Sequence, residues 1–381
     1  MSLLRQPFPV AVCGLLLAFG FQAFLVYGLY SGDWLGLYYT GAEVALPPLI
    51  EAEAPPRAPN ALGFDGQYYH VVAHDPLPAP EFAAFVDNPR LRWRRILAPA
   101  LAYAAALGQD AWVDRAYVAV LLGFSACGVW WMARLAVATD LPAWLGLAFL
   151  TLPATFISLE RLTMDVALAA LCAAFAVALR NAGKRWLGVV LALAPLARET
   201  GIALAGAWGA ASLLRRRWGG MATAALALVP LAAWSFYVHS HTPTDATAWF
   251  GSVPLGGLAA RMFELFPEPA PTLGLKVAAG LEYVALLGVW AAIVLVAIEL
   301  KRAPAEPLAL AAAMTLAIFV FLSKEDIWRH SYGFARTLSP AFLLLGLLGV
   351  RERRAWLGLP WALTAPRIGY QLALLVLSGM R

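Results

Sequence analysis

Charged residues are scarce in this chain, and their scarcity indicates the class of protein. Only 13% of the 381 residues are charged, whereas 61% are hydrophobic. Soluble domains contain about 45–50% apolar and about 25% charged residues. A soluble fold of this size could not cover so much apolar surface, so the lipid bilayer is the solvent that fits the composition.

Cysteine is also rare, and several catalytic motifs are missing. Cys13, Cys127 and Cys172 lie in separate apolar runs, which argues against a disulfide framework or a Cys/His metal site. The sequence has no Walker loop, GxGxxG, HExxH or GxSxG motif. ATP-driven transport, zinc proteolysis and serine hydrolysis of those kinds lose support. Basic residues account for the net charge of +5 but sit between apolar runs, so nucleic acid is not an expected partner.

Long apolar runs are abundant, and they predict an all-α polytopic membrane protein. A membrane-spanning helix takes about 20 residues, and the runs allow about eleven spans, with a range of about 10–12. We expect residues 1–381 to form a single transmembrane domain, with the first run retained as a helix. The runs cover residues 8–30, 96–108, 112–135, 142–158, 165–180, 186–197, 200–214, 219–238, 276–300, 306–322, 338–350 and 356–378.

Basic clusters between these runs predict the orientation, because Lys and Arg are enriched in cytoplasmic loops. The pattern is satisfied if 96–108 stays on the outer side as a juxtamembrane or re-entrant helix. Residues 31–111 then form a long first extracytoplasmic loop with juxtamembrane helices, and 239–275 form a second large one. The clusters are Arg5, Arg134, Arg180 with Lys184 and Arg185, Arg215 to Arg217, Lys301 with Arg302, and Arg351 to Arg354.

This orientation gathers the remaining ionisable residues on the outer side. Ionisable groups near membrane depth are costly and usually functional, so we expect a site there. The second outer loop has His239, His241 and Asp245, whose spacing is more typical of a solvated loop than of a metal site.

The first outer loop contains the sequence Gly63-Phe64-Asp65-Gly66-Gln67-Tyr68-Tyr69-His70. Glycines on both sides leave the Asp65 carboxylate uncrowded, and a carboxylate at the membrane boundary can act as a general base. The alternative is an aspartate that caps a short interfacial helix. His70 and His74 fit interfacial polar residues better than metal ligands.

Arginines cluster in the same loop, at Arg90, Arg92, Arg94 and Arg95. This cluster opposes the positive-inside bias and therefore needs another reason. Guanidinium groups bind phosphate in a bidentate manner, which predicts a lipid-phosphate clamp. The alternative is contact with lipid headgroups by side chains that reach the interface.

Three further groups of charged residues fall on the outer side. Glu160-Arg161 with Asp165 either faces a substrate or forms a hairpin tip and a helix cap. Arg198-Glu199 either contacts substrate or forms a structural ion pair. The segment Lys324 to Arg336, which includes Arg329, combines cations with aromatic rings and suits a phosphate and a sugar, or else is a structural charged loop.

The layout resembles the GT-C superfamily of integral membrane glycosyltransferases. The resemblance rests on a first span followed by a long outer loop with an early acid, on Arg94-Arg95-Ile96-Leu97-Ala98-Pro99, and on the Arg198-Glu199-Thr200-Gly201 hairpin. The Gly63 to Tyr69 segment with His74-Asp75-Pro76 is also similar to bacterial membrane proteins assigned to cell-surface glycopolymer formation.

The resemblance implies an enzyme of the bacterial inner membrane with its active site facing the periplasm or the exterior. It would move a sugar from a polyprenyl-phosphate donor to a glycan, lipid or protein acceptor. Asp65 matches the catalytic acid best, and Asp33, directly after the first span, is the rival. Mg²⁺ or Mn²⁺ is a candidate cofactor, although no Asp-x-Asp or Asp-Glu pair marks a metal site. The implied substrate- and phosphate-binding residues are Arg92, Arg94, Arg95, Arg198, Glu199, Arg329, Arg336, Tyr68, Tyr69, His70, Glu160 and Asp165.

Two other functions use the same residues differently. A transporter or flippase of lipid-linked saccharides would need the cationic outer cavity but no catalytic base. A non-catalytic subunit of an envelope glycopolymer assembly would tolerate changes at Asp65 or Arg95. The acid and the arginines are expected on one face, whereas transporters more often place charges inside helices at mid-membrane. The sequence therefore favours the transferase.

Overall fold

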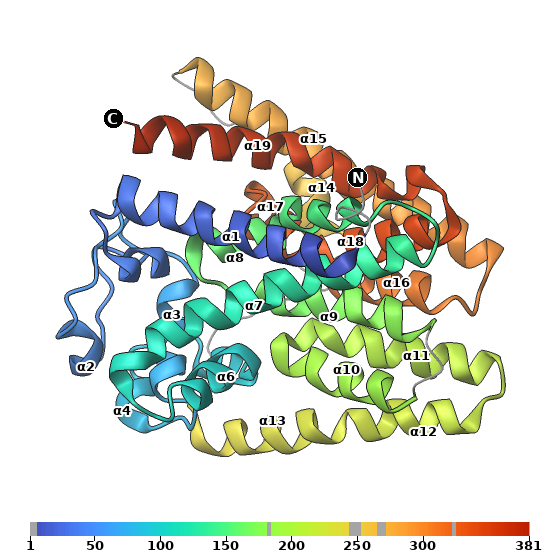
Figure 1. Cartoon of the computed structure of the whole chain (residues 1–381), viewed down its shortest axis with the longest axis horizontal. Coiled ribbons are helices and arrows are strands. Elements are labelled where there is room, and N and C mark those ends of the chain that lie inside the picture. Colours follow the sequence, from blue (N-terminus) through green and yellow to red (C-terminus); the bar gives the residue numbers. More distant parts are fainter. Residues whose placement is uncertain (1–5, 181–183, 244–252, 265–271, 322–324, 381) are drawn as a thin grey trace.

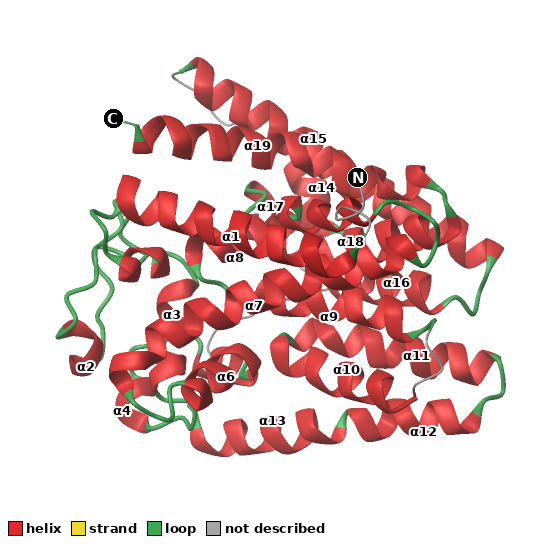
Figure 2. Cartoon of the chain, in the orientation of Figure 1, coloured by secondary structure: helices red, strands yellow, loops and turns green. Residues whose placement is uncertain are grey.

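The computed structural model describes residues 6–180, 184–243, 253–264, 272–321 and 325–380 (Figure 1). Over these ranges the chain is helical and has no β-strand beyond an isolated bridge between Thr40 and Arg57 (Figure 2). The all-α class predicted from the sequence is confirmed.

Five helical segments of the described chain are long and apolar enough to cross a membrane. A sixth crossing results if η3 (Ala143–Thr151) and α8 (Pro153–Arg161), bent by 61° against each other, form one broken span. The architecture is that of a helical membrane protein, whereas the number of about eleven spans stays a prediction. The five are α1 (Pro7–Leu29), α7 (Asp110–Val137), α12 (Trp218–Ala227) together with α13 (Val229–His241), α15 (Leu273–Arg302) and α18 (Phe334–Glu352).

Most of the remaining helices are shorter than these five segments. All 14 residues of α9 are buried, and they are almost entirely Ala, Leu, Val and Phe, so α9 lies inside the helix bundle. Beside the first-loop helices described below, the remaining elements are α10 (Lys184–Ala197), η4 (Glu199–Gly201), α11 (Ile202–Leu214), α14 (Gly256–Phe263), α16 (Pro307–Val320), α17 (Glu325–Arg329), η5 (Ala355–Gly358) and α19 (Leu359–Gly379), with α9 at Asp165–Ala178.

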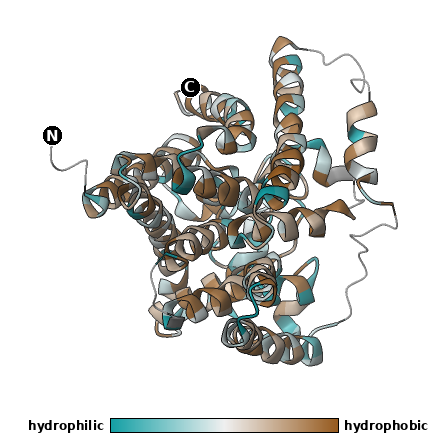
Figure 3. Cartoon of the chain, turned by 90° about the vertical axis from the view of Figure 1, so that its right-hand side faces the viewer, coloured by the Kyte–Doolittle hydropathy of each residue, from teal (hydrophilic) through white to brown (hydrophobic). Residues whose placement is uncertain are grey.

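The long helices differ greatly in how much the protein itself covers them. The most apolar stretch of α18 is 83% buried, whereas that of α12 and α13 is only 17% buried. Apolar colour nevertheless predominates on the helices (Figure 3), and large side chains such as Phe236 are exposed. In water such exposure would be costly, but in a bilayer these side chains contact lipid chains.

Residues 31–111 form a group of short helices at one end of the molecule (Figure 1, left). The last of them, α6, has nine residues. At 1.5 Å per residue it is about 14 Å long, which is too short to cross a hydrocarbon core of about 30 Å. The helices are η2 (Trp34–Tyr38), α2 (Pro48–Glu51), α3 (Gly66–His74), α4 (Pro80–Ala83), α5 (Pro89–Arg94) and α6 (Leu97–Ala105).

The connections that carry basic clusters lie at the opposite end. The turn between α11 and α12, with Arg215 to Arg217, and the turn after α15, with Lys301 and Arg302, are on the right in Figure 1. In the second predicted outer loop, residues 244–252, which include Asp245, and 265–271 lie outside the described residues, as does Lys324.

Candidate functional site

A cavity of about 500 Å³ collects residues from four separate parts of the chain. Its wall combines the first loop, the α10–α11 hairpin, the end of α16 and the segment 327–337. Five arginines line it against two carboxylates, and we call it the arginine cavity. Its charged lining residues are Asp65, Arg92, Arg94, Arg95, Arg198, Glu199 and Arg336.

Asp65 precedes α3 but its side chain makes no capping hydrogen bond to that helix. Instead Arg92 Nη2 donates to Oδ1 at 2.9 Å and Arg336 Nη2 donates to Oδ2 at 2.7 Å. Burial alone would raise the pKa of Asp65, but the two guanidinium groups hold it well below its usual range. The capping interpretation of this residue is therefore wrong, and Asp65 is a charged carboxylate held between two arginines.

The glycine after Asp65 explains how the carboxylate reaches this position. A Cβ atom at Gly66 would lie 2.2 Å from the carbonyl oxygen of Arg161, at the end of α8. Only a residue without a side chain allows the two backbones to approach so closely. The close approach puts the start of α3 against α8.

Arg92 and Arg95 project from one face of α5 and its C-terminal cap, as their spacing of three predicts. Arg95 donates to both carboxylate oxygens of Glu199, at 2.7 and 2.6 Å. Burial opposes ionisation, but Arg95 lowers the pKa of Glu199 to about 2. This bidentate ion pair connects the first loop to the α10–α11 hairpin.

Tyr69 lies on the α3 face that meets these arginines. Its hydroxyl accepts from Arg95 Nη1 at 2.8 Å and from Arg92 Nη1 at 3.3 Å. The ring is buried, so Tyr69 supports the guanidinium groups and has no free ring face for a ligand. The Tyr68 ring lies beneath Arg92, 4.8 Å from its guanidinium carbon.

Arg198 and Arg336 meet at Asp165. Arg198 Nη1 contacts Oδ1 of Asp165, and Arg336 Nε lies 3.7 Å from Oδ2. Burial, with repulsion from nearby arginines, lowers the pKa of Arg198 to about 9, so the group is still protonated at pH 7. Crowded guanidinium groups are stabilised by an additional anion.

Other residues predicted for this site lie elsewhere. Asp33 caps η2 by accepting from Leu35 N at 2.9 Å, and it lines a different cavity of about 830 Å³. Arg329 lines a third cavity, beside Arg261. Glu160 is buried and accepts from the Tyr332 hydroxyl. Asp33 and Arg329 are therefore not among the residues that line the arginine cavity.

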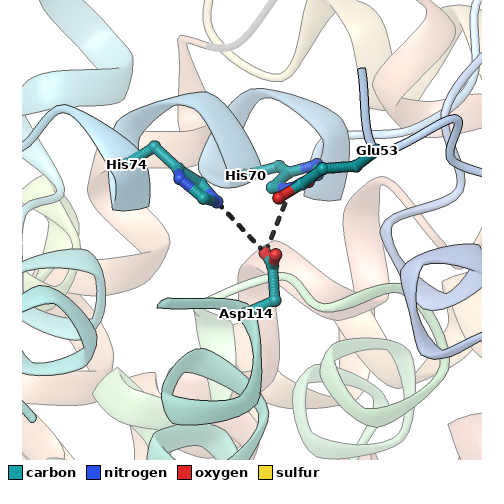
Figure 4. A group of neighbouring side chains, drawn as sticks. All are labelled: Glu53, His70, His74 and Asp114. Carbon is teal, nitrogen blue, oxygen red and sulfur yellow. Dashed lines mark ion pairs between the residues drawn. The ribbon is translucent and has the colours of Figure 1, made fainter. Parts of the chain in front are cut away.

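His70 also lies outside the arginine cavity, and it belongs to a second group of polar side chains. His70 and His74 extend from α3 toward Asp114 on α7, with Glu53 beside them (Figure 4). We call these four residues the His–carboxylate cluster. The sequence contained its signal, because histidines four apart share one helix face, but Glu53 and Asp114 come from segments that no local pattern connects to α3.

Comparisons with known proteins identify no relative: no family model, no curated protein and no solved structure matches this chain.

Proposed function

We propose that this chain is a membrane glycosyltransferase that takes a sugar from a polyprenyl-phosphate donor. The observation that carries the proposal is the arginine cavity, in which the half-buried carboxylate of Asp65 from the first loop adjoins guanidinium groups from three parts of the chain. Guanidinium groups match phosphate geometry, and the excess of cations over carboxylates favours a ligand with negative charge.

The cavity also suits a ligand with an apolar part. Ile318, Phe319 and Ile327 line it together with the arginines. A sugar phosphate attached to a hydrocarbon chain combines these two characters in one molecule. We infer that the phosphate contacts the arginines while the chain passes the apolar wall toward lipid.

Asp65 is the proposed general base. The acceptor hydroxyl oxygen would form a bond to the anomeric carbon while its proton moves to Asp65, and the bond between that carbon and the phosphate oxygen would break. The departing polyprenyl phosphate keeps the electron pair, and Arg92, Arg95, Arg198 and Arg336 stabilise its charge. Attack opposite the leaving group inverts the anomeric centre.

The ion pairs of Asp65 require one further step. A carboxylate held by Arg92 and Arg336 is a weak base, since its pKa lies well below the usual range. A donor phosphate would compete for the same guanidinium groups and raise that pKa. In this proposal donor binding activates the base, so acceptor deprotonation follows donor binding. No step passes through Mg²⁺ or Mn²⁺, because Asp65 and Glu199 both engage arginines.

The orientation in the membrane belongs to the same proposal. The basic turns after α11 and α15 lie at the end opposite the first loop (Figure 1), which favours a cytoplasmic location for those turns. The arginine cavity would then open on the periplasmic or exterior side of a bacterial inner membrane.

The observation that both carboxylates lining the cavity are ion-paired favours a second candidate, a transporter of lipid-linked saccharides. Such a protein needs anion binding but no base. The acceptor, whether glycan, lipid or protein, has no role in that function.

Both candidates are tested with purified protein in vesicles that contain a panel of polyprenyl-phosphate sugars. The transferase releases polyprenyl phosphate and forms a new glycoside, and Arg336→Gln reduces this turnover. Arg57→Gln is the matched control, since Arg57 pairs with Glu51 outside the cavity. Movement of the intact donor across the bilayer without product would replace the transferase by the transporter. If Arg336→Gln reduces neither sugar transfer nor movement of the donor, the arginine cavity takes part in neither function.

A further inference from the structure

The His–carboxylate cluster joins three segments that are distant in sequence. Glu53 lies in the first loop, His70 and His74 on α3, and Asp114 on α7 (Figure 4). One oxygen or nitrogen from each side chain lies within 4.8 Å of the others. Both histidine side chains have no exposed surface.

The spacing of these atoms resembles the edges of a coordination tetrahedron. His70 Nε2 lies 3.0 Å from Asp114 Oδ1 and 3.4 Å from Glu53 Oε2, and His74 Nε2 lies 3.5 Å from Asp114 Oδ1. Ligands at about 2.0–2.2 Å from a tetrahedral zinc ion are separated by about 3.3–3.6 Å. The three separations are therefore close to those of ligands around one ion.

Buried polar atoms in the cluster have no hydrogen-bond partner among the described residues. These atoms are both ring nitrogens of His70, Nε2 of His74 and Oε2 of Glu53. The nearby carboxylate oxygens are at suitable distances but not in hydrogen-bonding directions. Unpaired buried nitrogens and oxygens are costly, and a cation between them would satisfy Nε2 of both histidines and Oε2 of Glu53.

The surroundings hold the ligands in place. Asp110 Oδ1 lies 3.2 Å from His74 Nδ1, which is the outer carboxylate contact that orients metal-bound histidines. Tyr38 stacks on the His70 ring at 3.9 Å and donates its hydroxyl hydrogen to Asp114 Oδ1 at 2.8 Å. Glu53 and Asp114 also line the cavity of about 830 Å³, which gives an ion access from outside.

We propose that Glu53, His70, His74 and Asp114 bind one divalent transition-metal ion of the zinc type. Two imidazole nitrogens favour zinc over Mg²⁺ or Ca²⁺, which prefer oxygen ligands. The two negative charges of the carboxylates balance the +2 charge of the ion, and the two histidines bind it in their neutral form. Four protein ligands are typical of a structural site, and this one attaches α3 to α7. The inference does not depend on the proposed function.

The test uses full-length protein in detergent, purified without a metal-affinity step and treated with a chelator. Zinc is added, and bound metal is measured by mass spectrometry and titration calorimetry. We expect one zinc ion per chain, and Co²⁺ in its place should give the strong visible absorption of tetrahedral coordination. A chain that retains no stoichiometric metal, or a Co²⁺ spectrum of octahedral type, would overturn the proposal.

Variants locate the ion. His70→Gln or His74→Gln should raise the zinc Kd at least about 100-fold, and Asp110→Asn should raise it about 10-fold, as for an outer contact. His239→Gln is the control, because His239 is an exposed histidine away from the cluster, and its Kd should equal that of the wild type. If a histidine variant does not fold, the zinc Kd of Glu53→Gln and the Co²⁺ spectrum of the wild type still test whether the ion binds in this cluster. Equal Kd values in all variants would place the ion elsewhere and contradict the proposal.

Discussion

The arginine cavity and the His–carboxylate cluster share helix α3 but have opposite electrostatic character. Tyr69 contacts Arg92 and Arg95 on one side of the helix, whereas the adjacent His70 faces Asp114 and Glu53. Arginines outnumber carboxylates in the first region, and carboxylates and histidines make up the second. The difference teaches that one short helix can separate a region rich in guanidinium groups from a region rich in carboxylates and histidines.

The largest expected effect is that of Asp65→Asn on sugar transfer. The substitution keeps the shape of the side chain but removes the proton acceptor, so turnover should fall by about 10²–10⁴-fold. Asp33→Asn is the control, since Asp33 lies in the same loop outside the arginine cavity and Asn caps as well as Asp. Initial rates at saturating donor measure the turnover of both variants. Inactivity of Asp33→Asn with an active Asp65→Asn would reverse the assignment.

The next effect separates the two regions by their ligands. A polyprenyl phosphate at about 100 times its Kd should stabilise the protein by about 2.7 kcal/mol, and zinc at the same multiple should do likewise. Arg336→Gln should weaken only the response to phosphate, and His74→Gln only the response to zinc. The rise in unfolding temperature on adding each of the two ligands to each of the two variants measures these responses. If either variant loses both responses, the two regions are not independent.

A smaller effect is the loss of folding stability at low pH. The pKa of Glu199 is about 2 in the folded protein and about 4.5 in the unfolded chain. Stability from the Arg95–Glu199 pair is therefore complete above about pH 4.5 and lost as the pH falls toward 2. Because Glu199 is partly exposed, we expect a loss of about 1–2 kcal/mol.

Thermal unfolding between pH 7 and pH 3 measures this loss. Glu199→Gln is the comparison, because it removes the titrating group and leaves Arg95 without its carboxylate. The variant should start less stable at pH 7 and depend less on pH than the wild type. Identical slopes would show that Glu199 does not control the acid response.

The smallest effect is that of Arg57→Gln. Arg57 and Glu51 form an ion pair of 2.6 Å in the first loop, but both side chains are substantially exposed. Such pairs contribute about 0–1 kcal/mol, so the variant should unfold close to the wild-type temperature and bind both ligands. If Arg57→Gln lost as much stability as Glu199→Gln, the different burial of the Arg57–Glu51 and Arg95–Glu199 pairs would not explain how much each pair stabilises the protein.

The sequence predicted the helical class and much of the arginine cavity because both depend on strong local signals. Apolar runs indicated the helices, and the scarcity of charge made Asp65, Arg95 and Arg198 conspicuous. Positive-inside reasoning then assigned these residues to one side. The structure brings Arg198 to Asp65 and Arg95, which lie more than 100 residues earlier in the chain.

Other features were beyond local patterns. The spacing of His70 and His74 was visible, but their partners Glu53 and Asp114 are found only when α3 packs on α7. Asp33 follows the first span as a catalytic acid would, yet its backbone geometry turns the carboxylate to cap η2. Which carboxylate meets which arginine depends on tertiary contacts that no spacing rule specifies.

Arg161 lies behind the wall of the arginine cavity, where it contacts the lining residues Phe64 and Tyr332. Its guanidinium carbon lies 4.1, 4.7 and 4.5 Å from the ring centres of Tyr39, Phe64 and Tyr332, so the first loop and the segment 327–337 both contact this cation. Lifting the first loop away would remove two of the three rings, those of Tyr39 and Phe64, from this cation. Because Phe64 and Tyr332 also line the arginine cavity, a change in the position of the first loop would alter the shape of that cavity.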